Sequence, residues 1–175
     1  GKTTFFNLIS GLLPPDAGRL ELDGVNLTGL PPHKITAAGI ARTFQNVRIF
    51  ERMTVLENVM VGRHCRSNSG VLSAILKLPT ERREERMIRE RCLECLKQVK
   101  LEARANEAAG SLPCGRMRSL EIARALAAEP RLLLLDEPAA GLNHTETEAL
   151  AELIQEIRGL GLSIVLVEHD MRLVM

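Results

Sequence analysis

Two short runs of apolar residues in the second half of the chain form its clearest hydrophobic pattern. Leu132–Asp136 and Ser163–Val167 are apolar at almost every position, which is typical of strands buried on both faces. Residues 116–128 and 145–158 instead repeat apolar side chains at helical spacing, and a further helix is expected to start at Asp170. Buried strands that alternate with amphipathic helices predict an α/β protein whose parallel sheet is covered on both faces.

The first half of the chain predicts shorter elements. Residues 2–12 have helical spacing, and a glycine near the end of this helix is expected to stop it. Residues 19–27 alternate polar and apolar positions around Asp23-Gly24, a dipeptide that is typical of a tight β-hairpin. Residues 39–45 predict a short strand. These elements are expected as insertions on the sheet of the second half.

Two further helices are predicted between these regions. One is expected to begin after Thr54, whose side chain is a good N-terminal cap. The other covers residues 81–99, where apolar side chains fall on one face and charged ones on the others. Cys92 and Cys95 in this helix have neither a second cysteine pair nor a neighbouring histidine. Packing thiols are therefore expected there rather than a zinc or redox site.

Composition limits the classes of partner. The 175 residues are 45% apolar, which is enough for a substantial core, and 23 Lys and Arg against 22 Asp and Glu give a formal net charge of +1. That balance and an aromatic content of only 2% disfavour a nucleic-acid partner. The longest strongly apolar run, Leu132–Leu135, is far too short to cross a bilayer, so a cytosolic chain is expected.

Two stretches carry candidate chemistry. Gly1-Lys2-Thr3 matches the last three positions of a phosphate-binding loop, G-x-x-x-x-G-K-[ST], and stands where the first helix begins. The alternative is an ordinary glycine before a helix. Asp136 and Glu137 end a buried strand, so they are expected at the carboxyl edge of the sheet, where open α/β proteins bind ligands. One carboxylate could hold Mg²⁺ and the other could orient a water molecule, or the two could form a simple acidic turn.

An ordered set of short motifs resembles the nucleotide-binding subunit of an ABC transporter over essentially the whole chain: GKTT, Gln45, LPCGRMRSLEIARALA, LLLLDEP, AAGLN and VEHD. Three segments are further similar to the ATP-binding subunits of branched-chain amino acid importers: ARTFQNVRIFERMTVLENV, DEPAAGLN and VEHDMRLVM. The resemblance implies the ABC ATPase fold, a P-loop NTPase-like parallel sheet core with helices on both faces, a small antiparallel β hairpin unit and a helical subdomain. That subdomain, with the signature loop, would cover approximately residues 54–115 of a single cassette domain over residues 1–175, truncated at both ends.

The resemblance assigns nucleotide contacts to this sequence, and the implied nucleotide is ATP. Lys2 would bind the β- and γ-phosphates, while Gly1, Thr3 and Thr4 would lie on the phosphate side. Gly115 in the signature loop would contact the γ-phosphate that a second subunit holds.

The resemblance also assigns catalytic and metal-binding roles. Glu137 would polarise the attacking water, His169 would donate to the γ-phosphate, and Gln45 would sense the metal and the water. The implied Mg²⁺ ligands are Thr3, Gln45 and Asp136.

The signature loop departs from the family's usual Leu-Ser-Gly-Gly-Gln form. Pro113 replaces the serine, and Cys114 and Arg116 replace the small or aromatic residue and the glutamine, whereas Gly115 is kept. A helix that starts directly behind the loop would still direct its N–H groups at phosphate. ATP binding therefore has more support than normal hydrolysis. Asn143 stands where the family often has an aspartate at a dimer contact.

The implied protein is the ATPase motor subunit of an ABC importer at the cytoplasmic face of the inner (plasma) membrane. Its implied partners are a second ABC ATPase subunit, transmembrane permease subunits and a periplasmic substrate-binding protein. One alternative is a regulatory or weakly active cassette, which LPCGR supports. Another is the ABC ATPase of a soluble nucleic-acid or translation machine, although such proteins usually carry two cassettes or long coiled insertions. The 175-residue stretch alone is expected to bind ATP poorly and to be inactive, because most N–H groups of the phosphate loop lie outside it.

Overall fold

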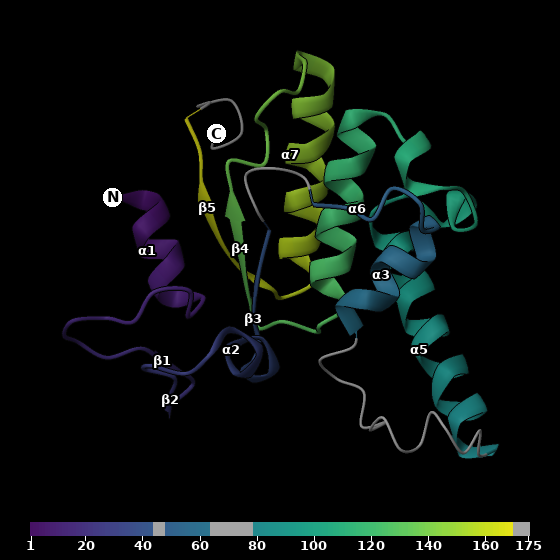
Figure 1. Cartoon of the computed structure of the whole chain (residues 1–175). Helices are drawn as coiled ribbons and strands as arrows, with labels where there is room; N and C mark the ends of the chain where they lie inside the picture. Colours follow the sequence, from purple (N-terminus) through teal and green to yellow (C-terminus); the bar gives the residue numbers. More distant parts are fainter. Residues whose placement is uncertain (44–47, 64–78, 170–175) are drawn as a thin grey trace. The chain divides into compact units, whose positions relative to one another are not determined.

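The structure, a computed structural model, describes residues 1–43, 48–63 and 79–169 (Figure 1). The chain forms two compact units: Gly1–Arg48 together with Ala128–Met175, and Ile49–Ala127. We call them the sheet unit and the helical unit. The predicted helical subdomain over residues 54–115 falls inside the second of these, and its status as a subdomain of one cassette stays a prediction.

A three-stranded parallel sheet is the centre of the sheet unit. Its strands, in spatial order, are β3 (Ile40–Arg42), β4 (Leu132–Asp136) and β5 (Ser163–Val167). Their register pairs Leu132 with Ser163 and Asp136 with Val167. The bounds of β4 and β5 and their parallel pairing confirm the prediction from the apolar runs, but β5 is only partly buried, with Ser163 exposed, and the burial predicted for both of its faces is wrong. The three middle side chains of β4 are completely buried, as expected for a central strand.

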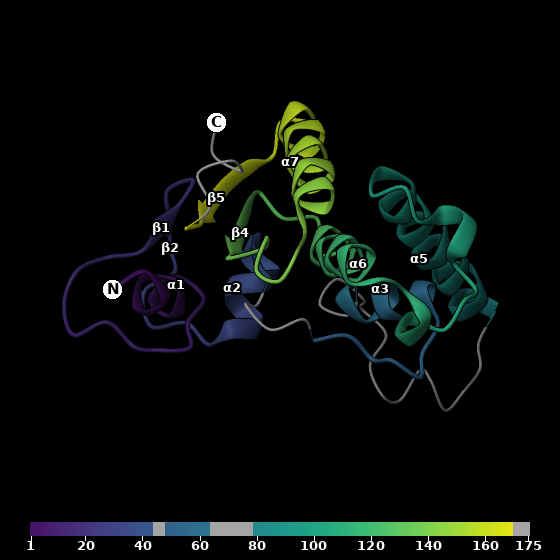
Figure 2. The same ribbon diagram turned by 90° about the horizontal axis from the view of Figure 1, so that it is seen from above.

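Helices cover both faces of this sheet, as predicted. α1 (Lys2–Ile9) and α7 (His144–Gly159) lie on opposite sides of the strands (Figures 1 and 2). α2 (Pro32–Ala38) precedes β3, and the sequence pattern does not predict it, because Pro31 before it and Pro32 at its start look like a break in regular structure. Pro32 is nevertheless compatible with the first turn of a helix, where the missing N–H has no intrahelical partner to lose.

α1 ends at Ile9, three residues before the predicted end. The chain turns at Gly11, which has a φ of 71°. A Cβ at Gly11 would lie 2.6 Å from the carbonyl oxygen of Leu30 and 2.7 Å from Cδ1 of Ile35. This close approach, which the helical pattern alone does not reveal, explains the early end.

The predicted hairpin is present. β1 (Glu21–Leu22) pairs antiparallel with β2 (Val25–Asn26). Between them Asp23 and Gly24 have φ angles of 49° and 80°, the left-handed conformation that a type I′ turn requires at both central positions. The turn residues therefore set the hairpin, as the Asp-Gly dipeptide indicates.

The described part of the helical unit consists mainly of packed helices. Its described helices are α3 (Val55–Arg63), α5 (Pro79–Gln98) and α6 (Cys114–Leu126), and two 3-10 turns follow α5, η2 (Glu102–Arg104) and η3 (Ala109–Ser111). α3 packs against both α5 and α6. Gly62 permits the close approach of α3 to α6, because a Cβ there would collide with the carbonyl group of Arg124.

α3 starts where the sequence predicts. The backbone N and Oγ1 of Thr54 donate to Oε2 of Glu57 at 2.7 and 2.9 Å, and Glu57 N donates to Thr54 Oγ1 at 3.1 Å. The two residues form a capping box, in which each side chain satisfies a backbone N–H of the other. The helix start that Thr54 alone predicted is thus held by reciprocal hydrogen bonds between Thr54 and Glu57.

α5 agrees closely with the helix predicted over residues 81–99. Cys92 on this helix is completely buried, and burial raises the pKa of its thiol to about 12. A thiol that remains protonated at neutral pH is a weak nucleophile and a weak metal ligand. This environment agrees with a packing role.

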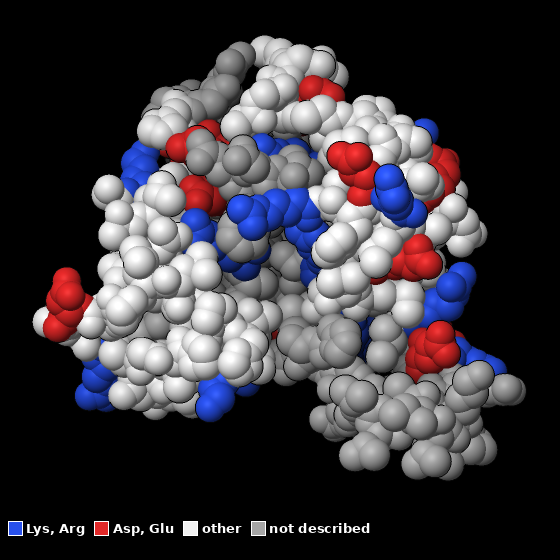
Figure 3. All heavy atoms as spheres, viewed as in Figure 1, with Lys and Arg blue, Asp and Glu red and all other residues white. Residues whose placement is uncertain are grey.

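Acidic and basic side chains are interspersed on the face shown in Figure 3. α5 has 20 residues but is strongly charged. Within residues 1–43, 48–63 and 79–169, none of the helices combines the length and the apolar character that crossing a membrane would need.

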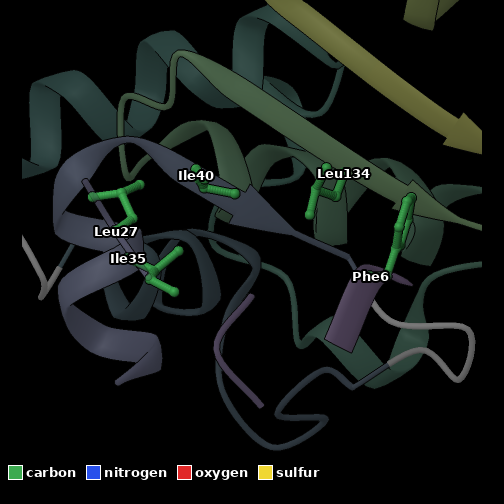
Figure 4. Packing of buried hydrophobic residues seen from close by; sticks show 5 residues of the cluster. All are labelled: Phe6, Leu27, Ile35, Ile40 and Leu134. Carbon is green, nitrogen blue, oxygen red and sulfur yellow. The ribbon is translucent and has the colours of Figure 1, made fainter. Parts of the chain in front are cut away.

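A cluster of apolar side chains fixes α1 on the sheet. It consists of Phe6, Leu27, Ile35, Ile40 and Leu134, each no more than 3% exposed (Figure 4). These residues come from α1, the segment after β2, α2, β3 and β4. Because the cluster joins elements that are distant in the chain, it determines where the first turn of α1 lies relative to the strands.

Candidate functional site

The carboxyl ends of β4 and β5 form the edge of the sheet where polar residues gather. Asp136 and Val167 end the two strands side by side. Glu137 N donates to the carbonyl oxygen of Val167 at 2.8 Å, so the pairing continues one residue beyond β4. Glu137 itself has a φ of 46°, a left-handed conformation that residues other than glycine rarely adopt. Such strained backbone is concentrated at functional sites in proteins.

Glu137 and His169 form a close pair. Oε1 of Glu137 lies 2.9 Å from Nε2 of His169. The Glu137 side chain is 23% exposed and the His169 side chain 71%, so a ligand from solvent can reach both. A carboxylate in contact with an imidazole can accept and donate a proton, which is the chemistry that hydrolysis needs. The structure thus brings two of the predicted catalytic residues together.

The start of α1 reaches the same place. Nζ of Lys2 donates to the carbonyl oxygen of Glu168 at 3.4 Å, although 166 positions separate the two residues. Residues 1–4 are exposed at the N-terminus of α1, where backbone N–H groups attract anions. The predicted phosphate-side residues therefore lie beside the residue that precedes His169.

Asp136 has a different environment from Glu137. It is only 3% exposed, and Nη2 of Arg42 donates to its Oδ2 at 2.8 Å. Nη1 of Arg42 also donates to Oδ1 of Asn7 at 2.7 Å and to Oγ of Ser10 at 3.1 Å. A single guanidinium group therefore joins α1, β3 and the end of β4. The two adjacent carboxylates have different partners, Arg42 for one and a histidine for the other.

Sequence reasoning did not identify Arg42. Its guanidinium carbon also lies 5.5 Å from the centre of the Phe6 ring, which adds a cation–π contact. An arginine inside an otherwise apolar strand is the signal that could have found it, because a buried charge requires a partner of opposite charge.

Glu168 was likewise missed. Its Oε1 accepts a hydrogen bond from Ala139 N at 2.8 Å, and its Oε2 accepts one from His169 N at 3.0 Å. The carboxylate connects the turn after β4 to the end of β5. Only its position beside a candidate histidine could have drawn attention to it.

Thr3 and Asp136 are the predicted Mg²⁺ ligands that can be placed, since Gln45 lies outside the described residues. Thr3 is in the first turn of α1 and Asp136 ends β4, and these two elements contact each other. Mg²⁺ prefers oxygen ligands and usually keeps water and phosphate oxygens, so a hydroxyl group and a carboxylate suit it. Among the residues that the structure describes, no group of three or more His, Cys, Asp or Glu could hold a metal ion.

The signature loop corrects one prediction. The helix predicted over residues 116–128 begins earlier, at Cys114, so Gly115 lies in the first turn of α6 and not in a loop before it. Pro113 is the N-cap, and its carbonyl oxygen accepts a hydrogen bond from Arg116 N at 2.9 Å. Proline is tolerated at this helix start because the N–H that it lacks would have no intrahelical partner. The nucleotide contact assigned to Gly115 stays a prediction.

Asn143 begins α7. Its Oδ1 accepts a hydrogen bond from Glu146 N at 3.0 Å, and Oε2 of Glu146 accepts one from Asn143 N at 3.1 Å. This capping box gives Asn143 a structural role within its own chain. Its expected contact with a second subunit stays a prediction.

Comparison with known families and relatives places these features in context. The family model that describes ABC transporters matches residues 1–140. The chain is 47% identical to the high-affinity branched-chain amino acid transport ATP-binding protein BraF of Pseudomonas aeruginosa, and 45% identical to LivG of Escherichia coli, which carries the same description. Each alignment covers 100% of this chain and 69% of the relative.

Solved structures share the fold. The ATP-binding cassette MJ1267 in its ADP conformation has a TM-score of 0.81 and 30% identity, over 99% of this chain and 68% of that one. The cassette MJ0796, in a dimeric post-hydrolysis state bound to ADP and Pi, has a TM-score of 0.74 and 29% identity, over 99% of this chain and 72% of that one. The predicted ABC ATPase fold is confirmed.

Proposed function

Because the chain belongs to the ABC transporter family, we propose that it is the ATP-hydrolysing subunit of an importer for branched-chain amino acids. The importer assignment rests on the names of BraF and LivG, which are similar to this chain over its whole length. The assignment of hydrolysis rests on the carboxyl edge of the sheet. There, Glu137 and His169 lie 2.9 Å apart beside Lys2.

Each of these side chains has a distinct task in the proposed reaction. Lys2 and the N–H groups at the start of α1 bind the phosphates and offset their charge. Glu137 accepts a proton from the attacking water, and His169 holds that carboxylate in place and donates to the terminal phosphate. Gln45 is proposed to contact the same water from the segment that follows β3.

Mg²⁺ is the proposed metal, and it would neutralise charge on the phosphates when bound. Thr3, Gln45 and Asp136 are the proposed protein ligands. Arg42 holds Oδ2 of Asp136, so this carboxylate is already oriented and partly neutralised before any ion binds. A buried carboxylate of this kind keeps its geometry without depending on solvent.

Two such subunits are proposed to close on two ATP molecules, with Gly115 of each facing the nucleotide of the other. The dimeric state of MJ0796 with ADP and Pi supports this arrangement. Transmembrane permease subunits and a periplasmic substrate-binding protein complete the proposed system, and the chain is proposed to bind the membrane peripherally from the cytoplasmic side. Closure and reopening would pass the energy of hydrolysis to the permease.

A regulatory cassette that binds ATP without turnover is the second candidate. The observation that favours it is the signature turn, where Pro113 caps α6 and Cys114 and Arg116 flank Gly115. Such a cassette would keep the nucleotide contacts of the sheet unit and lose activation by its partner.

The deciding experiment measures phosphate release and labelled leucine uptake by the complete protein, assembled in lipid vesicles with its permease and its substrate-binding protein. The matched pair of variants is Glu137→Gln in the site and Glu152→Gln on the exposed face of α7. We expect Glu137→Gln to reduce hydrolysis about 10²- to 10⁴-fold while nucleotide affinity is retained, because a general base contributes on that order. Glu152→Gln should behave as the unmodified protein.

Each contrary outcome has its own meaning. Nucleotide binding without hydrolysis by the unmodified protein would favour the regulatory cassette. Full hydrolysis by Glu137→Gln would show that Glu137 is not the general base. Hydrolysis that leucine does not stimulate would leave the ATPase assignment and refute the importer assignment.

A further inference from the structure

We propose that Glu168 is a positioning residue for hydrolysis, whose carboxylate holds the segments that carry Glu137 and His169 in their working arrangement. This inference rests on the proposed function for its effect on turnover. The geometry that leads to it belongs to the described residues of the sheet unit alone.

The segments that carry Glu137 and His169 are far apart in the sequence, so noncovalent contacts must hold them together. Glu137 follows β4 and His169 follows β5, and the Glu168 side chain bridges the gap between these strand ends. One carboxylate oxygen accepts the N–H of Ala139, two residues after Glu137, at 2.8 Å, and the other accepts the N–H of His169 at 3.0 Å. Both oxygens of one carboxylate are thus used, one on each segment.

The turn that carries Glu137 needs such support. With a φ of 46°, Glu137 has a backbone conformation that is unfavourable for a residue with a side chain. Local hydrogen bonds hold it from two sides, since Glu137 N donates to Val167 O at 2.8 Å and Ala140 N donates to Glu137 O at 3.1 Å. The bond from Ala139 N to Glu168 adds a contact to the acidic side chain of a different segment.

A carboxylate is suited to this position for a chemical reason. The two groups to be satisfied are both backbone N–H donors, and an ionised carboxylate offers only acceptors. Hydrogen bonds to an ionised acceptor are shorter and stronger than those between neutral groups. A glutamine would keep one acceptor and place an NH₂ group against the second donor, while an alanine would remove both bonds.

The backbone of Glu168 also contacts Lys2, a residue predicted to bind phosphate. Lys2 donates to the backbone carbonyl of Glu168, and this contact does not involve the Glu168 side chain. Changing the side chain should therefore disturb the Glu137–His169 pair more than it disturbs the residues that bind nucleotide. We therefore expect a change in the Glu168 side chain to lower kcat more than it alters KM for ATP.

The first test measures kcat and KM for ATP in the complete protein with its permease, for Glu168→Gln, Glu168→Ala and the control Glu152→Gln. We expect kcat to fall about 10-fold in Glu168→Gln and about 100-fold in Glu168→Ala, with KM changed less than about 3-fold, because small misplacement of reacting groups costs rates of this order. An unchanged kcat, or a KM that rises in step with the loss of kcat, would overturn the proposal.

A double-mutant cycle shows whether Glu168 acts through the pair. In a His169→Ala background, Glu168→Ala should reduce kcat clearly less than the roughly 100-fold expected in the unmodified protein, since residues that act as one unit are not additive. Two effects that simply multiply would mean that Glu168 acts elsewhere and would refute the positioning role.

Amide hydrogen exchange tests the bridge without relying on turnover. In Glu168→Ala, the Ala139 and His169 amides should exchange at least about 10-fold faster, while amides in the middle of β4 and the whole of Glu152→Gln stay unchanged. Unchanged exchange at Ala139 and His169 would refute the bridge even if the unmodified protein hydrolysed no ATP. Absence of hydrolysis in that protein would count against the proposed function instead.

Discussion

Two arginine–aspartate pairs of almost equal length lie at opposite ends of the same strand. Arg42 and Asp136 are 2.8 Å apart at the carboxyl end of β4, and Arg131 and Asp23 are 2.7 Å apart at its amino end. The side chains of the first pair are 7% and 5% exposed, and those of the second are 66% and 59% exposed. The distance alone would suggest equal importance, whereas the surroundings predict very different contributions.

The exposed pair joins the hairpin turn to the residue before β4. It borders an open groove that also includes the strongly exposed Leu160. In water the attraction between such charges is weak, and holding two long side chains in one geometry costs conformational entropy. The ion pair at the amino end of β4 therefore links two surface residues but contributes little to the stability of the fold.

The buried pair connects three elements. Removing two charges from water is costly, so the pair is stable only because Arg42 also donates to Asn7 and Ser10 and lies against the Phe6 ring. Once these contacts are made, loss of either partner leaves a buried charge uncompensated. The carboxyl end thus combines catalytic candidates with a network on which the local structure depends.

The largest expected effect comes from Arg42→Met, which fills a similar volume but removes the charge. We expect a loss of about 3–5 kcal/mol in the free energy of unfolding, because Asp136 would remain buried without its counter-ion. Urea unfolding followed by circular dichroism measures it, with Arg131→Met as the matched control. Equal losses in the two variants would show that burial does not distinguish the pairs.

Arg42→Lys sharpens the comparison by keeping the charge. A lysine ammonium is a single point donor, so it cannot reproduce the planar contact with Asn7, Ser10 and Asp136 at once. We expect a loss of about 1–3 kcal/mol in the free energy of unfolding, the value of one or two hydrogen bonds that involve a charged group. The same unfolding measurement applies. A lysine variant as unstable as Arg42→Met would mean that the guanidinium geometry, and not its charge, dominates.

Sequence patterns predicted the strands and the hairpin turn that carry these ion pairs. β4 and β5 occupy the predicted residues because both are apolar at almost every position, which is typical of strands in a parallel sheet, and the Asp23-Gly24 turn appears because few dipeptides adopt two left-handed conformations. The error at the end of α1 has a tertiary cause, the packing of Gly11 against Leu30. The cause at α2 is local, because the helix starts with a proline.

The candidate site was predictable only where residue type carries chemistry. Glu137 stood out as an acid at a strand end and His169 through the family resemblance, and the structure places them in contact. Arg42 and Glu168 did not, because their importance depends on partners 94 and 29 positions away. No local pattern encodes such a distance, so a bridge between strand ends becomes visible only in three dimensions.

Arg131→Met should have a much smaller effect than Arg42→Met. We expect a change of about 0–1 kcal/mol in the free energy of unfolding, the range for exposed ion pairs. Salt screens exposed charges, so the effect should shrink further between low and high ionic strength, whereas the Arg42→Met effect should be nearly insensitive to salt. Unfolding measurements at two salt concentrations check both statements, and strong salt dependence at Arg42 alone would reverse the comparison.

Glu57 in the helical unit extends the comparison to a carboxylate on an exposed residue. Hydrogen bonds from the backbone and then from the side chain of Thr54 lower the pKa of Glu57 below its usual value of 4.5. Because the folded protein favours the ionised form, this contribution to stability is present above pH 4.5 and is lost as the pH falls through the lowered pKa. We therefore expect Glu57→Gln to be slightly less stable than the unmodified protein at pH 7, and the difference to shrink below pH 4.5. Unfolding free energies of both proteins between neutral and acid pH measure it; a difference that grows toward acid pH would mean that the capping box does not favour the ionised carboxylate.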